Sequence, residues 1–328
     1  MIKKILKTLL IAIIVLVIGF VSLVFIRKDR TFEAPYPDIK ASMDSAVIAR
    51  GKAIVNGPAH CAFCHAPMDD FLRVEKGEEV PLSGGFTFHL PIGTMYAPNI
   101  TNDMETGIGK RTDGEIARTL RYGIRYDGKA VLDFMPFYDL SDDDLTAVIS
   151  FIRSQPAIKN QRPQHEYNFL GKAVMAFLVE PMGDGEVPPA PPADSTVEYG
   201  KYLAISVTNC RGCHTNRSMM TGAYIGPDFA GLTQFEILDD NLEIIKGKHL
   251  VTPNLTPDPQ TGRMEGWTQQ DFIKRFRTGR VIPGSPMPWG PFSRMSEMEL
   301  KAIYKFLKSI APVKISTPLG IQEGDPAS

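Results

Sequence analysis

The chain has 328 residues, of which 43% are hydrophobic and 22% charged, so its composition is that of a folded protein of about two domains and excludes wholesale disorder. The formal charge of −1 hides an asymmetry, because residues 1–30 carry a net charge of +5 and residues 31–328 carry −6. We do not expect an acidic soluble part to bind nucleic acid.

The first predicted element is a transmembrane helix over residues 8–26. This 19-residue stretch is apolar except for Thr8, Gly19 and Ser22, and it is about long enough to cross the hydrocarbon core of a membrane. A cleaved signal peptide has a shorter apolar core and a small-residue cleavage site, whereas FIRKDR follows here. We therefore predict that residues 1–30 are an uncleaved anchor. Three basic residues stand on each side of the span, so charge alone does not set its orientation.

The rest of the chain contains two copies of a unit of about 110 residues, at 44–154 and 195–311. The clearest match is between APNIT at 97–101 and TPNLT at 252–256, each followed five residues later by Thr-Gly. Residues 155–194, with a short predicted helix and the proline-rich VPPAPPAD, connect the two copies. This repetition predicts two tandem domains.

The sequence of each copy indicates the same two helices. The first, at 112–123 or 268–279, is about ten residues long, with a threonine N-cap and a terminal glycine. The second is capped by Ser141 or Ser296 and repeats apolar residues at helical spacing. Because no strand pattern is convincing, we expect an all-α fold, with residues 312–328 as an irregular tail.

The four cysteines form two CxxCH motifs, CAFCH at 61–65 and CRGCH at 210–214. Two thiols one helical turn apart can form thioethers to the two vinyl groups of one porphyrin, and the next imidazole then ligates the iron. The motifs predict two covalently bound haem c groups, attached through Cys61, Cys64, Cys210 and Cys213, with His65 and His214 as axial ligands.

Three other uses of the cysteines fit the spacing less well. A zinc site made from two CxxC pairs normally has them about 15–20 residues apart, whereas 145 residues separate Cys64 from Cys210. A thioredoxin-like redox pair needs a βαβ setting, which the sequence lacks. A disulfide inside one CxxC pair is strained and leaves the adjoining histidine unexplained.

Met135 and Met287 are predicted as the second axial ligands. They lie 70 and 73 residues after His65 and His214, and each belongs to a Met-Pro step before the last helix of its copy. A thioether is a soft ligand that suits haem iron. Methionine is otherwise common core filler. Met95 is the competing ligand in the first copy, and the second copy has no methionine in that neighbourhood.

Two further pairs of residues recur at equivalent positions. Arg121 and Arg277 each stand two residues before the helix-ending glycine, and they are candidate contacts of the haem propionates. The alternative is an arginine favoured by the helix dipole alone. The Pro-Asn pairs at 98–99 and 253–254 predict either a loop held against the haem or a simple turn.

The pattern resembles the membrane-bound diheme and multiheme c-type cytochromes that accept electrons in bacterial alcohol, aldehyde and gluconate dehydrogenase complexes. The resemblance covers about 270 residues and rests on CAFCH, the stretch from APNIT to TGIG, MPFYDLSDDDL, RPQHEYNF, CRGCH, TPNLTPDPQTG and MPWGPF. It implies two tandem class I cytochrome c-like domains behind a single N-terminal transmembrane helix. Family members usually have three CxxCH motifs and a C-terminal membrane segment, whereas this sequence has two motifs and an N-terminal apolar stretch.

The expected function is a non-catalytic electron relay from a periplasmic dehydrogenase or quinol-oxidising partner to the respiratory chain. Because haem is attached outside the cytoplasmic membrane, we expect a single pass through the bacterial inner membrane, with the haem domains in the periplasm. The alternative is a diheme enzyme such as a cytochrome c peroxidase with one open haem site. The duplicated Met-Pro loop argues against it.

Overall fold

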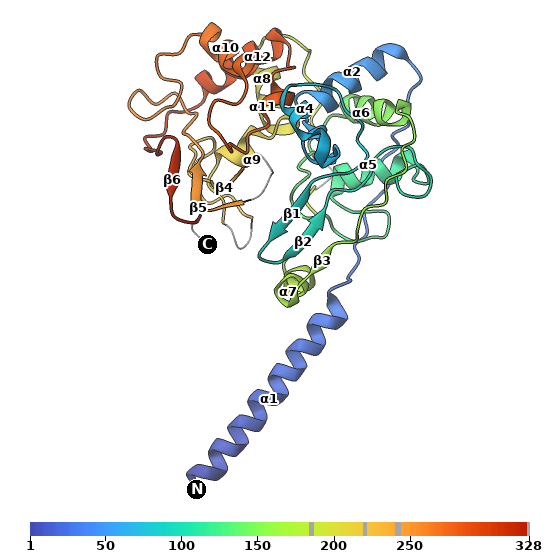
Figure 1. The fold of residues 1–328 in the computed structure, drawn as a ribbon, viewed down its shortest axis with the longest axis vertical. Coiled ribbons are helices and arrows are strands. Elements are labelled where there is room, and N and C mark those ends of the chain that lie inside the picture. Colours follow the sequence, from blue (N-terminus) through green and yellow to red (C-terminus); the bar gives the residue numbers. More distant parts are fainter. Residues whose placement is uncertain (184–186, 219–221, 240–243, 327–328) are drawn as a thin grey trace.

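The computed structural model describes residues 1–183, 187–218, 222–239 and 244–326. Figure 1 shows one long N-terminal helix that projects from a helix-rich body containing two small sheets. The projecting helix is α1 (Ile2–Arg27), and most of its apolar side chains are exposed. Its length and hydropathy are those of a membrane span or of a signal sequence. The predicted N-terminal helix is therefore confirmed, while its retention as an anchor stays a prediction.

The first repeat copy is built from helices around the first CxxCH motif. They are α2 (Ser45–Asn56), α3 (Cys61–His65), the short 3₁₀ helix η1 (Met68–Asp70), α4 (Phe71–Glu75), α5 (Asp113–Tyr122) and α6 (Asp142–Ser154). The Thr112 hydroxyl accepts a hydrogen bond from the Glu115 amide at the start of α5, and Gly123 ends that helix with φ 63°. Ser141 caps α6 in the same way. The predicted N-caps of both helices and the glycine that ends α5 are confirmed.

The second copy repeats this arrangement after a connecting helix, α7 (Phe169–Phe177). Its helices are α8 (Val197–Tyr202), the π-helical turn η2 (Leu203–Val207), α9 (Cys210–His214), α10 (Gln269–Thr278), α11 (Trp289–Phe292) and α12 (Glu297–Ser309). Thr268 and Ser296 cap α10 and α12 and complete capping boxes with acidic residues three positions later. These helices confirm the predicted helical repeat.

Two three-stranded antiparallel sheets qualify the all-α prediction. One contains β1 (Thr87–Leu90), β2 (Gly93–Tyr96) and β3 (Glu166–Tyr167), and the other contains β4 (Gln234–Leu238), β5 (Ile244–Val251) and β6 (Ile321–Glu323). The prediction that 312–328 is wholly irregular was wrong, because β6 pairs with β5 through Leu250 and Ile321. Most of these strands are too short to show the alternating pattern by which a sequence reveals a strand.

Glycine allows the first and last helices of each copy to cross with their backbones in contact. A Cβ atom added at Gly51 in α2 would lie 1.8 Å from the Ala147 carbonyl oxygen of α6. A Cβ atom at Gly200 in α8 would lie 2.0 Å from the Ala302 carbonyl oxygen of α12. No side chain fits either gap, so this repeated glycine is required by packing rather than by backbone conformation.

The two copies pack together around a buried ionic network. Arg50 in α2 donates two hydrogen bonds, of 2.9 and 3.1 Å, to the Asp144 carboxylate in α6, which is buried. Arg50 also donates to the Tyr199 hydroxyl at 3.3 Å, and the Tyr202 hydroxyl donates to Asp144 at 2.7 Å. Because Arg50 and Tyr199 occupy equivalent repeat positions, the two copies meet through the same face.

Replacement of Gly51 by alanine is predicted to lower the free energy of unfolding by about 1–3 kcal/mol, because the added methyl group must push α2 and α6 apart. Gly200→Ala should have the same effect. Gly114→Ala in α5 is the control, since its Cβ would meet Tyr36 at an ordinary 3.5 Å. Denaturant titration of the three variants measures the effect, and equal stabilities for Gly51→Ala and Gly114→Ala would contradict the close crossing.

Candidate haem sites

Each CxxCH motif forms a short helix that begins after a residue in the left-handed conformation. His60 precedes α3 with φ 42°, and Asn209 precedes α9 with φ 53°. Positive φ is uncommon outside glycine, although asparagine adopts it more readily than most residues. The Asn209 side chain also accepts a hydrogen bond from the Gly212 amide. The same sharp turn therefore presents both motifs.

The histidine of each motif is buried and hydrogen-bonded in the same way. His65 Nδ1 lies 2.9 Å from the carbonyl oxygen of Pro98, and His214 Nδ1 lies 3.1 Å from that of Pro253. A carbonyl oxygen only accepts, so Nδ1 carries the proton and the lone pair of Nε2 stays free for a metal. Burial lowers the pKa of His65, and it lowers the pKa of His214 to about 4. Both imidazoles are thus held in the neutral form that ligates iron.

A buried asparagine fixes the proline carbonyl that orients each histidine. Asn99 accepts hydrogen bonds from the Thr101 amide and hydroxyl at 2.9 and 2.8 Å, and it donates to the Ile158 carbonyl at 2.7 Å. Asn254 repeats the pattern with Thr256 and Val313. The Pro-Asn pairs are therefore more than simple turns, because they brace the loops that hold the histidines.

The cysteines are unpaired thiols in the structure. Cys61, Cys64 and Cys210 are half-buried, and Cys213 is exposed. Burial raises the pKa of Cys61 and of Cys64 to about 12. In the described part of the chain, three or more His, Cys, Asp or Glu side chains nowhere gather as a metal-binding cluster. The two CxxC pairs are thus not assembled as one zinc site.

Met135 and Met287 lie in equivalent loops and are half-buried against the hydrophobic core. The Phe137 amide donates to the Met135 carbonyl at 2.9 Å, and the Trp289 amide donates to the Met287 carbonyl at 2.8 Å. Each methionine therefore opens the same tight turn. Met95 instead lies in β2, opposite Phe88, and is 3% exposed. Ligation of haem iron by Met135, Met95 or Met287 stays a prediction.

Arg121 and Arg277 brace the segment between each Met-Pro loop and the last helix. The Arg121 guanidinium is buried and donates to the carbonyl oxygens of Tyr138, at 2.9 Å, and Leu140. Arg277 donates to those of Ser293 and Met295, at 2.7 and 2.6 Å. These contacts give both arginines a structural role that the sequence did not indicate, while their contact with haem propionates stays a prediction.

A residue close to each motif also contacts a residue near the methionine loop of the other copy. The ring of His60, just before the first motif, lies 5.4 Å from that of Phe292, which follows Met287 by five residues. Arg217, three residues after His214, forms an ion pair with Asp133, two residues before Met135. Periodicity within each copy could not predict these contacts, because they join different copies.

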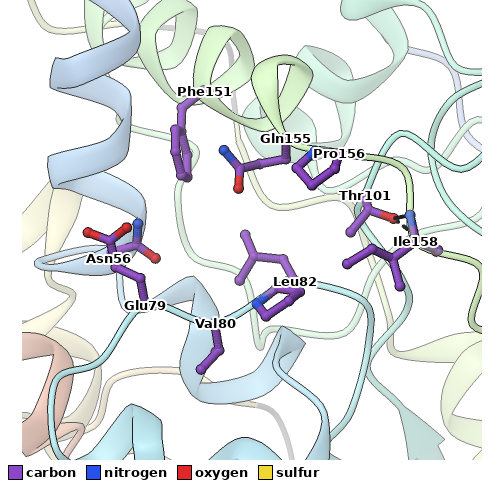
Figure 2. A pocket seen from close by; sticks show the side chains of 10 residues that line it. Asn56, Glu79, Val80, Leu82, Thr101, Phe151, Gln155, Pro156 and Ile158 are labelled. Carbon is purple, nitrogen blue, oxygen red and sulfur yellow. Dashed lines mark hydrogen bonds between the residues drawn. The ribbon is translucent and has the colours of Figure 1, made fainter.

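Figure 2 shows a pocket between α2, the end of α6 and the segment at 79–82. Phe151 and Leu82 form apolar walls, and Asn56 and Gln155 supply polar groups. Neither CxxCH motif and neither Met-Pro loop contributes to its lining. This pocket is therefore separate from the predicted haem sites.

Comparison with known proteins supports the assignment of the motifs. No family model matches the chain. It is 28% identical over 311 residues to the cytochrome c subunit of alcohol dehydrogenase (quinone) from Gluconobacter oxydans. The aligned region covers 86% of this chain and 58% of the relative. It is 27% identical to the fructose dehydrogenase cytochrome subunit of Gluconobacter japonicus over 84% of this chain and 55% of the relative.

The gluconate 2-dehydrogenase cytochrome c subunit of Pantoea cypripedii is 24% identical, over 95% of this chain and 68% of the relative. The chain resembles the cytochrome c subunits of bacterial dehydrogenase complexes. The resemblance seen in the motifs is thus confirmed, although the chain spans just over half the length of the first two relatives. Similarity to cytochrome c subunits implies covalently bound haem c, the cofactor that a CxxCH motif predicts.

Replacement of Asn99 by alanine is predicted to lower the free energy of unfolding by about 1–3 kcal/mol, because buried partners of its amide lose their hydrogen bonds. Asn254→Ala should cost a similar amount. Gln161→Ala is the control, since that amide donates only an exposed bond to the neighbouring Arg162 carbonyl. If urea unfolding gives Asn99→Ala and Gln161→Ala the same stability, the bracing role is wrong.

Proposed function

We propose that this chain is a membrane-tethered diheme cytochrome c that relays electrons from a periplasmic dehydrogenase or quinol-oxidising partner to the respiratory chain. The observation that carries the proposal is the duplicated histidine geometry, in which His65 and His214 each follow a CxxC pair and each turn Nδ1 toward a proline carbonyl. In this proposal residues 44–154 and 195–311 are two cytochrome c-like domains with one haem each. Residues 155–194 connect them.

The side chains of each domain suit a haem held from both faces. In the first domain Cys61 and Cys64 would form the thioethers, and His65 Nε2 and Met135 Sγ would ligate the iron. Cys210, Cys213, His214 and Met287 would take the same roles in the second. A bound haem supplies one-electron exchange between ferric and ferrous iron. The chain orients each imidazole, keeps it neutral and anchors each methionine in a tight turn.

Contacts between the domains support transfer of electrons from one haem to the other. Residues that flank each motif contact residues near the opposite methionine loop, His60 with Phe292 and Arg217 with Asp133. Electron tunnelling slows steeply with distance, so a relay needs its redox centres to be near a shared interface. Arg50 and Asp144 of the first domain bond the hydroxyl groups of Tyr199 and Tyr202 in the second, and these bonds join the two domains at that interface. The peroxidase alternative would favour two different methionine loops, whereas these share one turn.

The proposed partners and location come from the relatives and from α1. The relatives are named as cytochrome c subunits of alcohol, fructose and gluconate dehydrogenases. A catalytic dehydrogenase subunit is therefore the proposed electron donor. Helix α1 is long and apolar enough to cross the inner membrane once. The haem domains would then lie in the periplasm, where c-type haem is attached.

Met135→Ala and Met287→Ala are each predicted to remove about half of the methionine-to-iron charge-transfer band of the oxidised protein, because each removes one of two thioether ligands. Near-infrared absorption of the full-length haem protein measures the band. Met104→Ala, at a side chain that is 56% exposed, is the control and should retain all of it.

Met95→Leu separates the two candidate ligands of the first domain. We expect this variant to keep the full band, because Met95 fills the core beside β1 and leucine conserves its apolar character. Loss of half the band in Met95→Leu, with none lost in Met135→Ala, would contradict the proposed ligand set. A high-spin spectrum at one haem with rapid peroxide turnover in the unsubstituted protein would favour the enzyme.

A further inference from the structure

Helix α7 lies beside the end of α1 that meets the body of the molecule, as Figure 1 shows. The ring of Phe20 in α1 stacks on that of Phe177 with centroids 5.9 Å apart, and it meets the Phe169 ring edge-on at 6.4 Å. Phe20 is six residues before Ile26, where the apolar stretch ends. At 1.5 Å per residue, α7 therefore reaches about 9 Å along α1 into the predicted span.

Basic side chains at the end of α1 and just after it hold α7 in this position. Arg27 Nε lies 3.4 Å from the Ala176 carbonyl oxygen, and Arg30 Nε lies 3.3 Å from that of Met175. Arg30 also forms an ion pair with Glu180 at 2.9 Å. Cations that bond the carbonyl groups at a helix C-terminus are favoured by the helix dipole. The contact is thus made by side chains from both segments and is not a simple consequence of chain connectivity.

The outer face of α7, with Leu178 just after it, is apolar and exposed in the part of the chain that the structure describes. The side chains of Phe169, Leu170 and Leu178 are 46%, 55% and 56% exposed. The tip of the β1–β2 hairpin is attached beside them, because the Asn168 side chain donates to the Pro91 carbonyl at 2.8 Å. The backbone N–H of Asn168 also donates to the Ile92 carbonyl oxygen, at 3.2 Å.

We propose that residues 169–178 and the hairpin tip at 91–92 form a foot that inserts into the lipid surface beside α1. Helices that lie in a membrane interface bury their apolar face by about 5–10 Å, which matches the depth set by Phe20. Lys172 lies with Nζ 5.4 Å from the Phe25 ring, and with Arg27 and Arg30 it places cationic groups at the level of the lipid phosphates.

Phospholipid is the occupant that this geometry favours, because the exposed face continues the surface of α1. The inference rests on the proposed membrane tether. Its consequence is orientation: a body attached through α1 alone could swing on the segment after Arg27, whereas a second lipid contact fixes which side faces the membrane. The haem domains would then present a constant surface to partners in or above the membrane.

Labelling with photoactivatable lipid tests the foot. The full-length haem protein is reconstituted in phosphatidylethanolamine and phosphatidylglycerol vesicles that contain a phosphatidylcholine with a diazirine on its acyl chain. After photolysis, peptide mass spectrometry should find lipid adducts in α1 and also in residues 168–178. Adducts in α1 but not in 168–178 would overturn the foot and leave the tether intact. Adducts in neither segment would overturn the tether as well.

Charged substitutions make the test specific. The double variant Leu170→Glu and Leu178→Glu should lower the adduct yield in 168–178 several-fold while leaving the yield in α1 unchanged. Leu319→Glu is the control, because that side chain is also exposed, at 65%, but lies in the second half of the body. Unchanged adduct yield in the double variant would contradict insertion. The visible haem spectrum reports folding, and if the double variant misfolds, labelling of the unsubstituted protein still decides.

Discussion

The hydrogen bond from a buried histidine to a proline carbonyl is the interaction on which both predicted haem sites depend. His65 and His214 each need Nδ1 protonated, a neutral ring and a fixed ring plane before Nε2 can serve as a ligand. Pro98 and Pro253 provide the acceptors, at 2.9 and 3.1 Å. Burial supplies the neutral state in both copies. Both imidazoles are therefore prepared in the same way, by a protonated Nδ1, a neutral ring and a fixed ring plane.

Duplication also explains how the two copies are joined. Each copy crosses its first and last helices at a glycine, Gly51 or Gly200, and the residues just before these glycines, Arg50 and Tyr199, bond each other between the copies. Arg50 and Asp144 fill this contact with a bidentate ion pair, and Tyr199 extends the network into the second copy. Partners within one buried network must separate together, so the interface is expected to behave as a fixed unit rather than a flexible hinge.

The sequence predicted the features that local residue chemistry determines. Thr112 and Ser141 marked the starts of α5 and α6, and the CxxCH spacing identified the two motifs that lie at the predicted haem sites. It missed the short strands, whose pairing depends on partners distant in the chain, as with Leu250 and Ile321. It did not determine the role of Arg121, because only the fold brings the carbonyl oxygen of Leu140 to the Arg121 guanidinium. Contacts between different copies or distant segments do not recur at a regular spacing in the sequence. They therefore cannot be predicted from a sequence pattern.

The number of covalent haems per chain tests the central claim most directly. The full-length protein would be denatured and stripped of loosely bound pigment, and the remaining haem would be measured by its alkaline pyridine spectrum against the protein concentration. The account predicts two haems per chain, one for each CxxCH motif. A value of one, or a denatured chain that keeps no pigment, would contradict it.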